Sequence, residues 1–83
     1  MKVFITMVSW NTSDDRGTDI LGVYRELKDA QAQAQQEVEQ WKDDLSYNDD
    51  VVFETDNENW WSFDDRKSVY VEVSIIEKDC FLL

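Results

Sequence analysis

One run of apolar residues constrains the fold of this chain more than any other feature. Between Glu26 and about Leu45, apolar side chains recur at intervals of three and four residues: Leu27, Ala30, Ala34, Val38, Trp41 and Leu45. That spacing places them on one narrow stripe of an α-helix, and the absence of Pro and Gly from the segment agrees with it. A helix with a single apolar stripe must bury it against another layer, so we expect the remaining segments to supply a sheet.

The residues before the helix predict two strands. Lys2–Ser9 carries apolar side chains at both odd and even positions, which is typical of an interior strand with both faces covered. Asn11–Thr18 is rich in Asn, Ser and Asp and is expected to be a loop. Asp19–Arg25 is expected to be the second strand, in which Gly22 indicates a bulge or a close backbone contact.

The residues after the helix predict three more strands. Ser46–Asp50 has loop composition, and Val51–Thr55 and Trp60–Phe63 flank a polar turn. After a second turn at Asp64–Lys67, the segment Ser68–Glu77 alternates cleanly. Its apolar face consists of Val69, Val71, Val73 and Ile75. We expect this face to meet the helix stripe.

Together these segments predict one α+β domain over residues 1–83. The element order is β-β-α-β-β-β, with a mainly antiparallel sheet of four to five strands and the amphipathic helix packed on one face.

Charge narrows the classes of partner. The chain has 19 acidic and 8 basic residues, no His and a net charge of −11, but 42% of its residues are hydrophobic. That hydrophobic content favours a folded acidic domain over an acidic disordered tail. The charge repels nucleic acid and anionic membranes and favours basic proteins. Self-repulsion predicts modest stability that improves with salt.

The side chains that catalysis most often uses are scarce. With no His and only Cys80, neither a Ser-His-Asp triad nor a cysteine-based zinc site can form. Paired carboxylates are frequent, but a chain this short has little volume for the walled cleft that acid–base catalysis needs. We expect no enzymatic activity. The single cysteine and the lack of a signal peptide or apolar span favour a cytoplasmic protein.

No dedicated metal site and no cofactor are expected, although the charge density favours weak cation binding. The stretch Asp56–Asn59 has calcium-loop composition, but its third position is Glu58 and its sixth is Trp61, where an EF-hand needs another ligand type and glycine. The last four residues, 80–83, have the form of a prenylation signal. The preceding segment is not polybasic, so we expect the tail to pack against the sheet instead.

A local pattern resembles a small domain that recurs in uncharacterised bacterial and phage proteins. It consists of Ile20-Leu21-Gly22-Val23-Tyr24 leading into a helix through Arg25–Ala30, with Ala34 in the helix and Tyr70–Val73 in the final strand. The resemblance covers most of the chain. It implies the same fold and an origin in a mobile element, with no activity attached.

Two surfaces are candidates for binding a protein. The helix patch contains the acidic residues Glu26, Asp29, Glu37, Glu39, Asp43 and Asp44. The loop patch contains Asp49, Asp50, Asp56, Glu58, Asp64 and Asp65. Trp60 and Trp61 are adjacent in a predicted strand, so their side chains should point to opposite faces. One can join the core, and the other is exposed, covered by a neighbouring segment or held to anchor a contact with a partner.

These patches predict a non-enzymatic inhibitor that occupies the basic, nucleic-acid-binding surface of a host enzyme, as a DNA mimic does. Anti-restriction and anti-CRISPR proteins act in this way. The alternative is a structural or regulatory module that binds through the tryptophan-rich hairpin and whose partner need not be basic. The sequence leaves the identity of the partner and the oligomeric state open.

Overall fold

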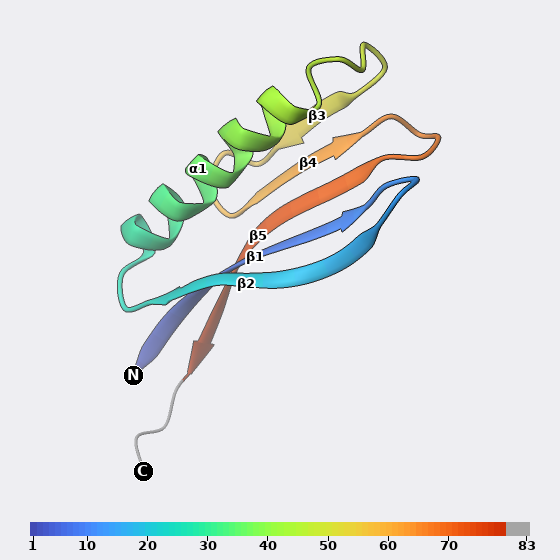
Figure 1. Ribbon diagram of the computed structural model, residues 1–83. Helices are drawn as coiled ribbons and strands as arrows, with labels where there is room; N and C mark the ends of the chain where they lie inside the picture. The colour runs from blue at the N-terminus through green and yellow to red at the C-terminus, as the bar shows by residue number, and fades with distance from the viewer. Residues whose placement is uncertain (80–83) are drawn as a thin grey trace.

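The structure, a computed structural model, describes residues 1–79 of the chain. Within them the elements run β1 (Lys2–Asn11), β2 (Arg16–Tyr24), α1 (Leu27–Asp44), β3 (Val52–Thr55), β4 (Trp60–Asp64) and β5 (Tyr70–Asp79). The five strands form one antiparallel sheet in the order β2-β1-β5-β4-β3 (Figure 1). The predicted α+β fold is confirmed, and β1 is an interior strand between β2 and β5, as its two apolar faces predict.

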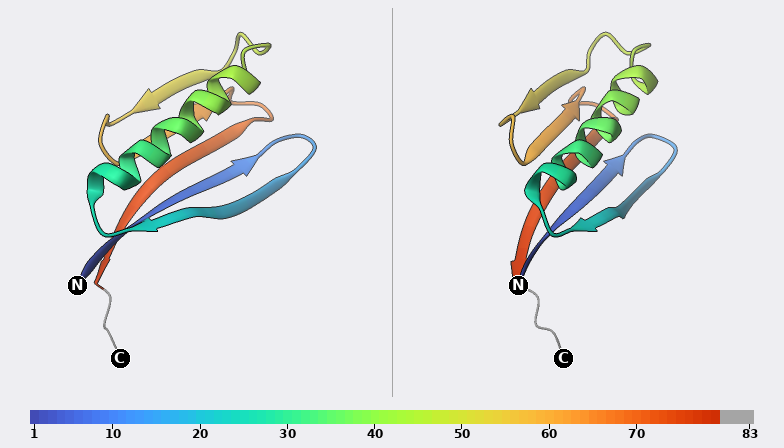
Figure 2. Two further views of the ribbon diagram at one scale, coloured as in Figure 1. Left: turned by 60° about the vertical axis from the view of Figure 1, so that its left-hand side comes forward. Right: turned by 90° about the vertical axis from the view of Figure 1, so that its left-hand side faces the viewer.

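The helix lies across one face of the twisted sheet and contacts β1, β2 and β5 (Figure 2). Its stripe residues Ala30, Ala34 and Val38 are fully buried, and so are Val71 and Val73 on the facing side of β5. These residues belong to one core cluster, so the predicted meeting of the helix stripe with the valine face is confirmed. Small side chains at the contact let the helix backbone approach the sheet closely.

The helix has the predicted bounds to within a residue. Glu26 precedes it with an extended backbone, and Leu45 ends it with an N–H that donates to the Trp41 carbonyl at 2.9 Å. Leu45 is buried, whereas Leu27 in the first turn is 36% exposed and Trp41 is only partly buried. The core therefore uses the stripe from Ala30 onward.

A buried polar contact joins the two layers. Thr6 on β1 faces the helix between Phe4 and Val8 and is fully buried. Its hydroxyl donates a hydrogen bond of 2.9 Å to the Ala30 carbonyl inside α1. Burying a hydroxyl is costly unless it is hydrogen-bonded, and this bond meets that condition.

The predicted loop at Asn11–Thr18 is wrong over half of its length. β1 extends to Asn11 and β2 begins at Arg16, so only residues 12–15 form the turn, closed by the Thr12 N–H that donates to the Asp15 carbonyl at 2.7 Å. The polar composition was misleading because β2 is an edge strand with exposed side chains at Arg16 and Thr18. Asp64 likewise ends β4 and is not in the turn.

Gly22 marks both features that the sequence predicts there. Thr6 pairs with Gly22 and Met7 pairs with Ile20, so Leu21 is an extra residue in a β-bulge. A Cβ on Gly22 would lie 2.5 Å from the Tyr24 hydroxyl oxygen, which donates a hydrogen bond of 3.0 Å to Gln33 Oε1 on the helix. Glycine is therefore needed for the close approach of the Tyr24 ring.

The predicted packing of the tail, residues 80–83, lies outside the described residues. Within residues 1–79, no helix combines the length and the apolar character needed to cross a bilayer.

Candidate protein-binding surfaces

The helix patch is exposed and largely free of internal contacts. Among residues 1–79, the carboxylates of Asp29, Asp43 and Asp44 take part in no hydrogen bond or ion pair, and all three residues are exposed. Glu26 and Glu39 pair with Lys28 at 3.2 Å and Lys42 at 3.7 Å respectively. Both pairs are at the surface, where such contacts contribute little. The helix thus presents its negative charge to solvent.

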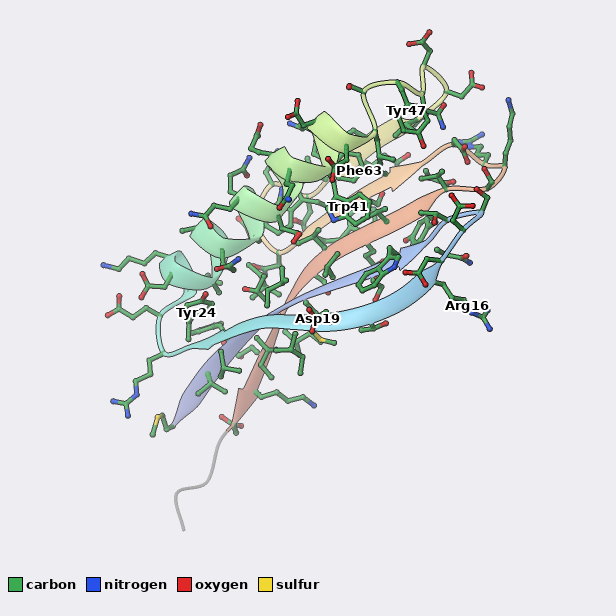
Figure 3. All side chains as sticks on the ribbon, in the orientation of Figure 1. Arg16, Asp19, Tyr24, Trp41, Tyr47 and Phe63 are labelled. Carbon is green, nitrogen blue, oxygen red and sulfur yellow. The ribbon has the colours of Figure 1, made fainter. Side chains whose placement is uncertain are left out.

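Carboxylates repel one another on one flank of the helix patch. Glu37 of α1 lies near enough to Asp44 and to Asp19 of β2, which Figure 3 labels, for their charges to act on it. Partial burial raises the pKa of Glu37 above its ordinary value of 4.5, and repulsion from Asp19 and Asp44 raises the pKa further. A cation brought to this flank would relieve the repulsion between the three carboxylates.

Few acids anywhere in the described part of the chain are neutralised. Only four of the 19 carboxylates lie within 4.0 Å of a lysine or arginine nitrogen, namely those of Glu26, Glu39, Asp50 and Glu77. The other carboxylates form no ion pair with the described residues, although several of them accept internal hydrogen bonds.

The loop patch does not form one surface. Asp49, Asp50 and the β4–β5 turn meet at one end of the sheet, where Lys67 Nζ lies 2.7 Å from Asp50 Oδ2. Asp56 and Glu58 lie in the β3–β4 turn at the other end of β4, where the Glu58 carbonyl accepts a hydrogen bond from Gln31 Nε2. Roughly 13 Å of strand separates the two groups.

Two acids of the loop patch build turns. Asp56 Oδ1 accepts backbone N–H bonds of 2.8–3.0 Å from residues 58–60, and these bonds lower the pKa of Asp56. Asp65, which is buried, accepts three such backbone bonds of 2.9 Å from Lys67, Ser68 and Val69. It also accepts a bond of 3.1 Å from the side-chain amide of Asn48. The backbone bonds, that from Val69 foremost, hold the pKa of Asp65 far below its usual range. These carboxylates stabilise the fold.

The two tryptophans point to opposite faces, as predicted. Trp61 is 5% exposed and belongs to the core cluster with Phe63, which Figure 3 labels, and with Val73, its partner on β5. Trp60 is partly exposed on the other side, and its indole N–H donates to Glu72 Oε2 at 2.9 Å. Of the pair, only Trp60 is available to a partner.

No helix or strand of the described residues lies over the face of the sheet opposite α1, hereafter the outer face (Figure 2). Ile20 and Val23 of β2, each 57% exposed, and Ile76 of β5, 38% exposed, lie on it. Toward β3 and β4 the outer face becomes polar and aromatic. The residues there that sequence reasoning missed are Glu54, Ser62, Tyr70 and Glu72. Strand alternation through Trp61 and Phe63 is the signal that places Ser62 and its neighbours on this face.

Within residues 1–79, no three His, Cys, Asp or Glu side chains are placed to hold a metal ion. No protein-family model, curated protein or solved structure matches the chain.

Proposed function

We propose that this chain is a non-enzymatic protein-binding domain that uses the helix patch to occupy the basic, nucleic-acid-binding surface of a partner enzyme. The observation that carries the proposal is the solvent-facing layer of helix carboxylates, of which Asp29, Asp43 and Asp44 have no partner among the described residues. A groove lined with lysine and arginine binds DNA by releasing counterions, and an exposed row of carboxylates competes for the same basic side chains.

Charge density sets the strength of this mimicry. Between Glu26 and Asp44 the chain carries six acids and two lysines, a net charge of −4. Those 19 residues span roughly 27 Å at a helical rise of about 1.5 Å, a length over which duplex DNA carries about 16 charges. Binding should therefore weaken with salt, but less steeply than the same partner's binding to DNA.

The test is a pull-down from host lysate at about 50 and 500 mM NaCl, with captured proteins then purified and assayed against labelled duplex DNA. The matched variants reverse two charges each. Glu39→Lys with Asp43→Lys changes the helix patch, and Asp14→Lys with Asp79→Lys changes two exposed acids outside it. Lysines near a helix C-terminus favour the helix, so the first variant should fold.

The proposal expects a salt-sensitive nucleic-acid-binding enzyme that DNA displaces. The variant Glu39→Lys with Asp43→Lys should no longer capture this enzyme, and the control variant Asp14→Lys with Asp79→Lys should still capture it. A partner that both variants retain equally, or that DNA does not displace, would contradict the proposal.

The exposed apolar residues of the outer face favour a second candidate, an interaction module with a partner that need not be basic. Ile20, Val23 and the partly exposed Trp60 are the side chains that such a module would use. Its binding should be insensitive to salt. Ile20→Ser with Val23→Thr should abolish it, whereas the helix variant should leave it intact.

A further inference from the structure

A hollow of about 150 Å³ lies on the outer face, over the last three strands of the sheet. Its polar and aromatic lining comes from Glu54, Trp60, Ser62, Asp64, Arg66 and Tyr70. At roughly 30 Å³ per water molecule the hollow holds about five waters. That is room for the head group of one side chain, whereas pockets for drug-sized ligands run to roughly 300–1,000 Å³.

Ser62 forms the floor of the hollow. It pairs with Glu54 on β3 and with Glu72 on β5, so the three side chains form one row across the outer face. Ser62 is only 4% exposed and lines the hollow, yet no hydrogen bond among residues 1–79 uses its hydroxyl. No fully buried side-chain nitrogen or oxygen among the described residues lacks a partner, so the Ser62 hydroxyl keeps contact with solvent in the hollow. A ligand with a hydrogen-bonding group can meet it there.

Glu72 holds in place the two aromatic side chains that line the hollow, Trp60 and Tyr70. Its Oε2 accepts hydrogen bonds from the Trp60 indole N–H at 2.9 Å and from the Tyr70 hydroxyl at 3.0 Å. One half-buried carboxylate oxygen thus ties both rings in place before any ligand arrives. Such preorganisation lowers the entropic cost of binding.

The charge of the hollow favours a cation. Glu54 and Asp64 line it, and Glu72 lies beside it. Burial raises the pKa of Tyr70, and so do its hydrogen bond to Glu72 and the charges of Glu72, Asp64 and Glu54, so all three carboxylates act on this ring. Arg66 is the only basic residue in the lining, and its side chain forms no ion pair with the described residues.

We propose that the hollow binds the guanidinium group of an arginine on a partner protein. A guanidinium is flat, carries five N–H donors and stacks on aromatic rings. It therefore matches two carboxylates, a free hydroxyl and two fixed rings better than a lysine ammonium does, because the ammonium is a compact and strongly hydrated charge. The site lies on the face opposite the helix patch, so it goes beyond the proposed function and does not depend on it.

The test is a titration of the ¹⁵N-labelled full chain with N-acetyl-arginine amide, followed by NMR at the Ser62 amide and the Trp60 indole. We expect saturable shifts at these positions. Glu54→Gln should weaken binding about fivefold, the upper range for one exposed ion pair. Asp43→Asn removes the same charge from the opposite layer, where the carboxylate has no partner among the described residues, and should leave the affinity unchanged.

Three results would overturn the proposal. Equal weakening in both variants would mean general attraction to an acidic surface. Equally tight binding of N-acetyl-lysine amide would remove the preference for guanidinium. Binding seen only after Arg66→Asn would mean that the chain's own Arg66 fills the hollow. Asparagine suits that test because Arg66 has a positive φ of 61°, which Asn tolerates.

Discussion

The hydrogen bond between Thr6 and the helix gives the sharpest prediction about stability. Thr6→Val keeps the shape of the buried side chain and removes the hydroxyl that donates to the Ala30 carbonyl. Because that carbonyl lies inside α1, it keeps its own helical bond and is not left without a donor. The cost is therefore the net value of one hydrogen bond, about 1 kcal/mol, and not the larger penalty of an unsatisfied buried group.

The measurement is urea unfolding followed by circular dichroism, with the free energy of unfolding extrapolated to water. For a domain of this size, a loss of about 1 kcal/mol lowers Tm by roughly 4–8 °C. Thr6→Ser is the matched control because it keeps the hydroxyl and loses only a methyl group. If Thr6→Val proves as stable as the wild type, the hydrogen bond does not hold the helix to the sheet. If the substitution costs more than about 3 kcal/mol, the Ala30 carbonyl is left without another donor when the Thr6 hydroxyl is removed.

Three further measurements test the structure. As pH falls from 7, the free energy of unfolding should first rise, because the raised pKa of Glu37 means that its charge opposes folding above about pH 4.5. The free energy of unfolding should then fall below about pH 3.8, because the backbone bonds that lower the pKa of Asp65 are made by its charged form, which protonation removes. A monotonic loss of stability from pH 7 would contradict this order. Gly22→Ala should cost roughly 1–3 kcal/mol, because the Tyr24 ring must move and release Gln33; an unchanged urea midpoint would contradict the close contact. Raising NaCl from about 0.05 to 0.5 M should raise Tm, because salt screens the repulsion within a chain of net charge −11; a flat response would contradict it.

Hydrophobic periodicity was sufficient to predict the order of the elements and the central packing contact. The helix stripe from Ala30 to Val38 and the alternation through Val71 and Val73 leave one way to bury both surfaces. Composition failed where it was used alone. Arg16 and Thr18 are polar, but on an edge strand their side chains face solvent, so polarity there does not indicate a loop.

The contacts of polar side chains were harder to predict. Thr6 is polar and gave no signal that it would be buried against the helix. The hollow depends on register, since Ser62 is flanked by Glu54 and Glu72 only because β3, β4 and β5 pair as they do. Cross-strand neighbours of this kind come from residues distant in the sequence, and a single sequence carries no record of their pairing.

The structure also separates acids that the sequence groups together, and this separation determines how binding can be tested. Asp56 and Asp65 each accept three backbone N–H bonds, so reversing their charge should disrupt a turn and reduce binding whether or not they touch a partner. Asp43 and Asp44 have no such contact among the described residues. A loss of binding on reversing their charge, with unfolding unchanged, therefore reports the interface itself. Experiments on the turn acids do not distinguish the acidic mimic from the apolar module, and experiments on the helix acids do.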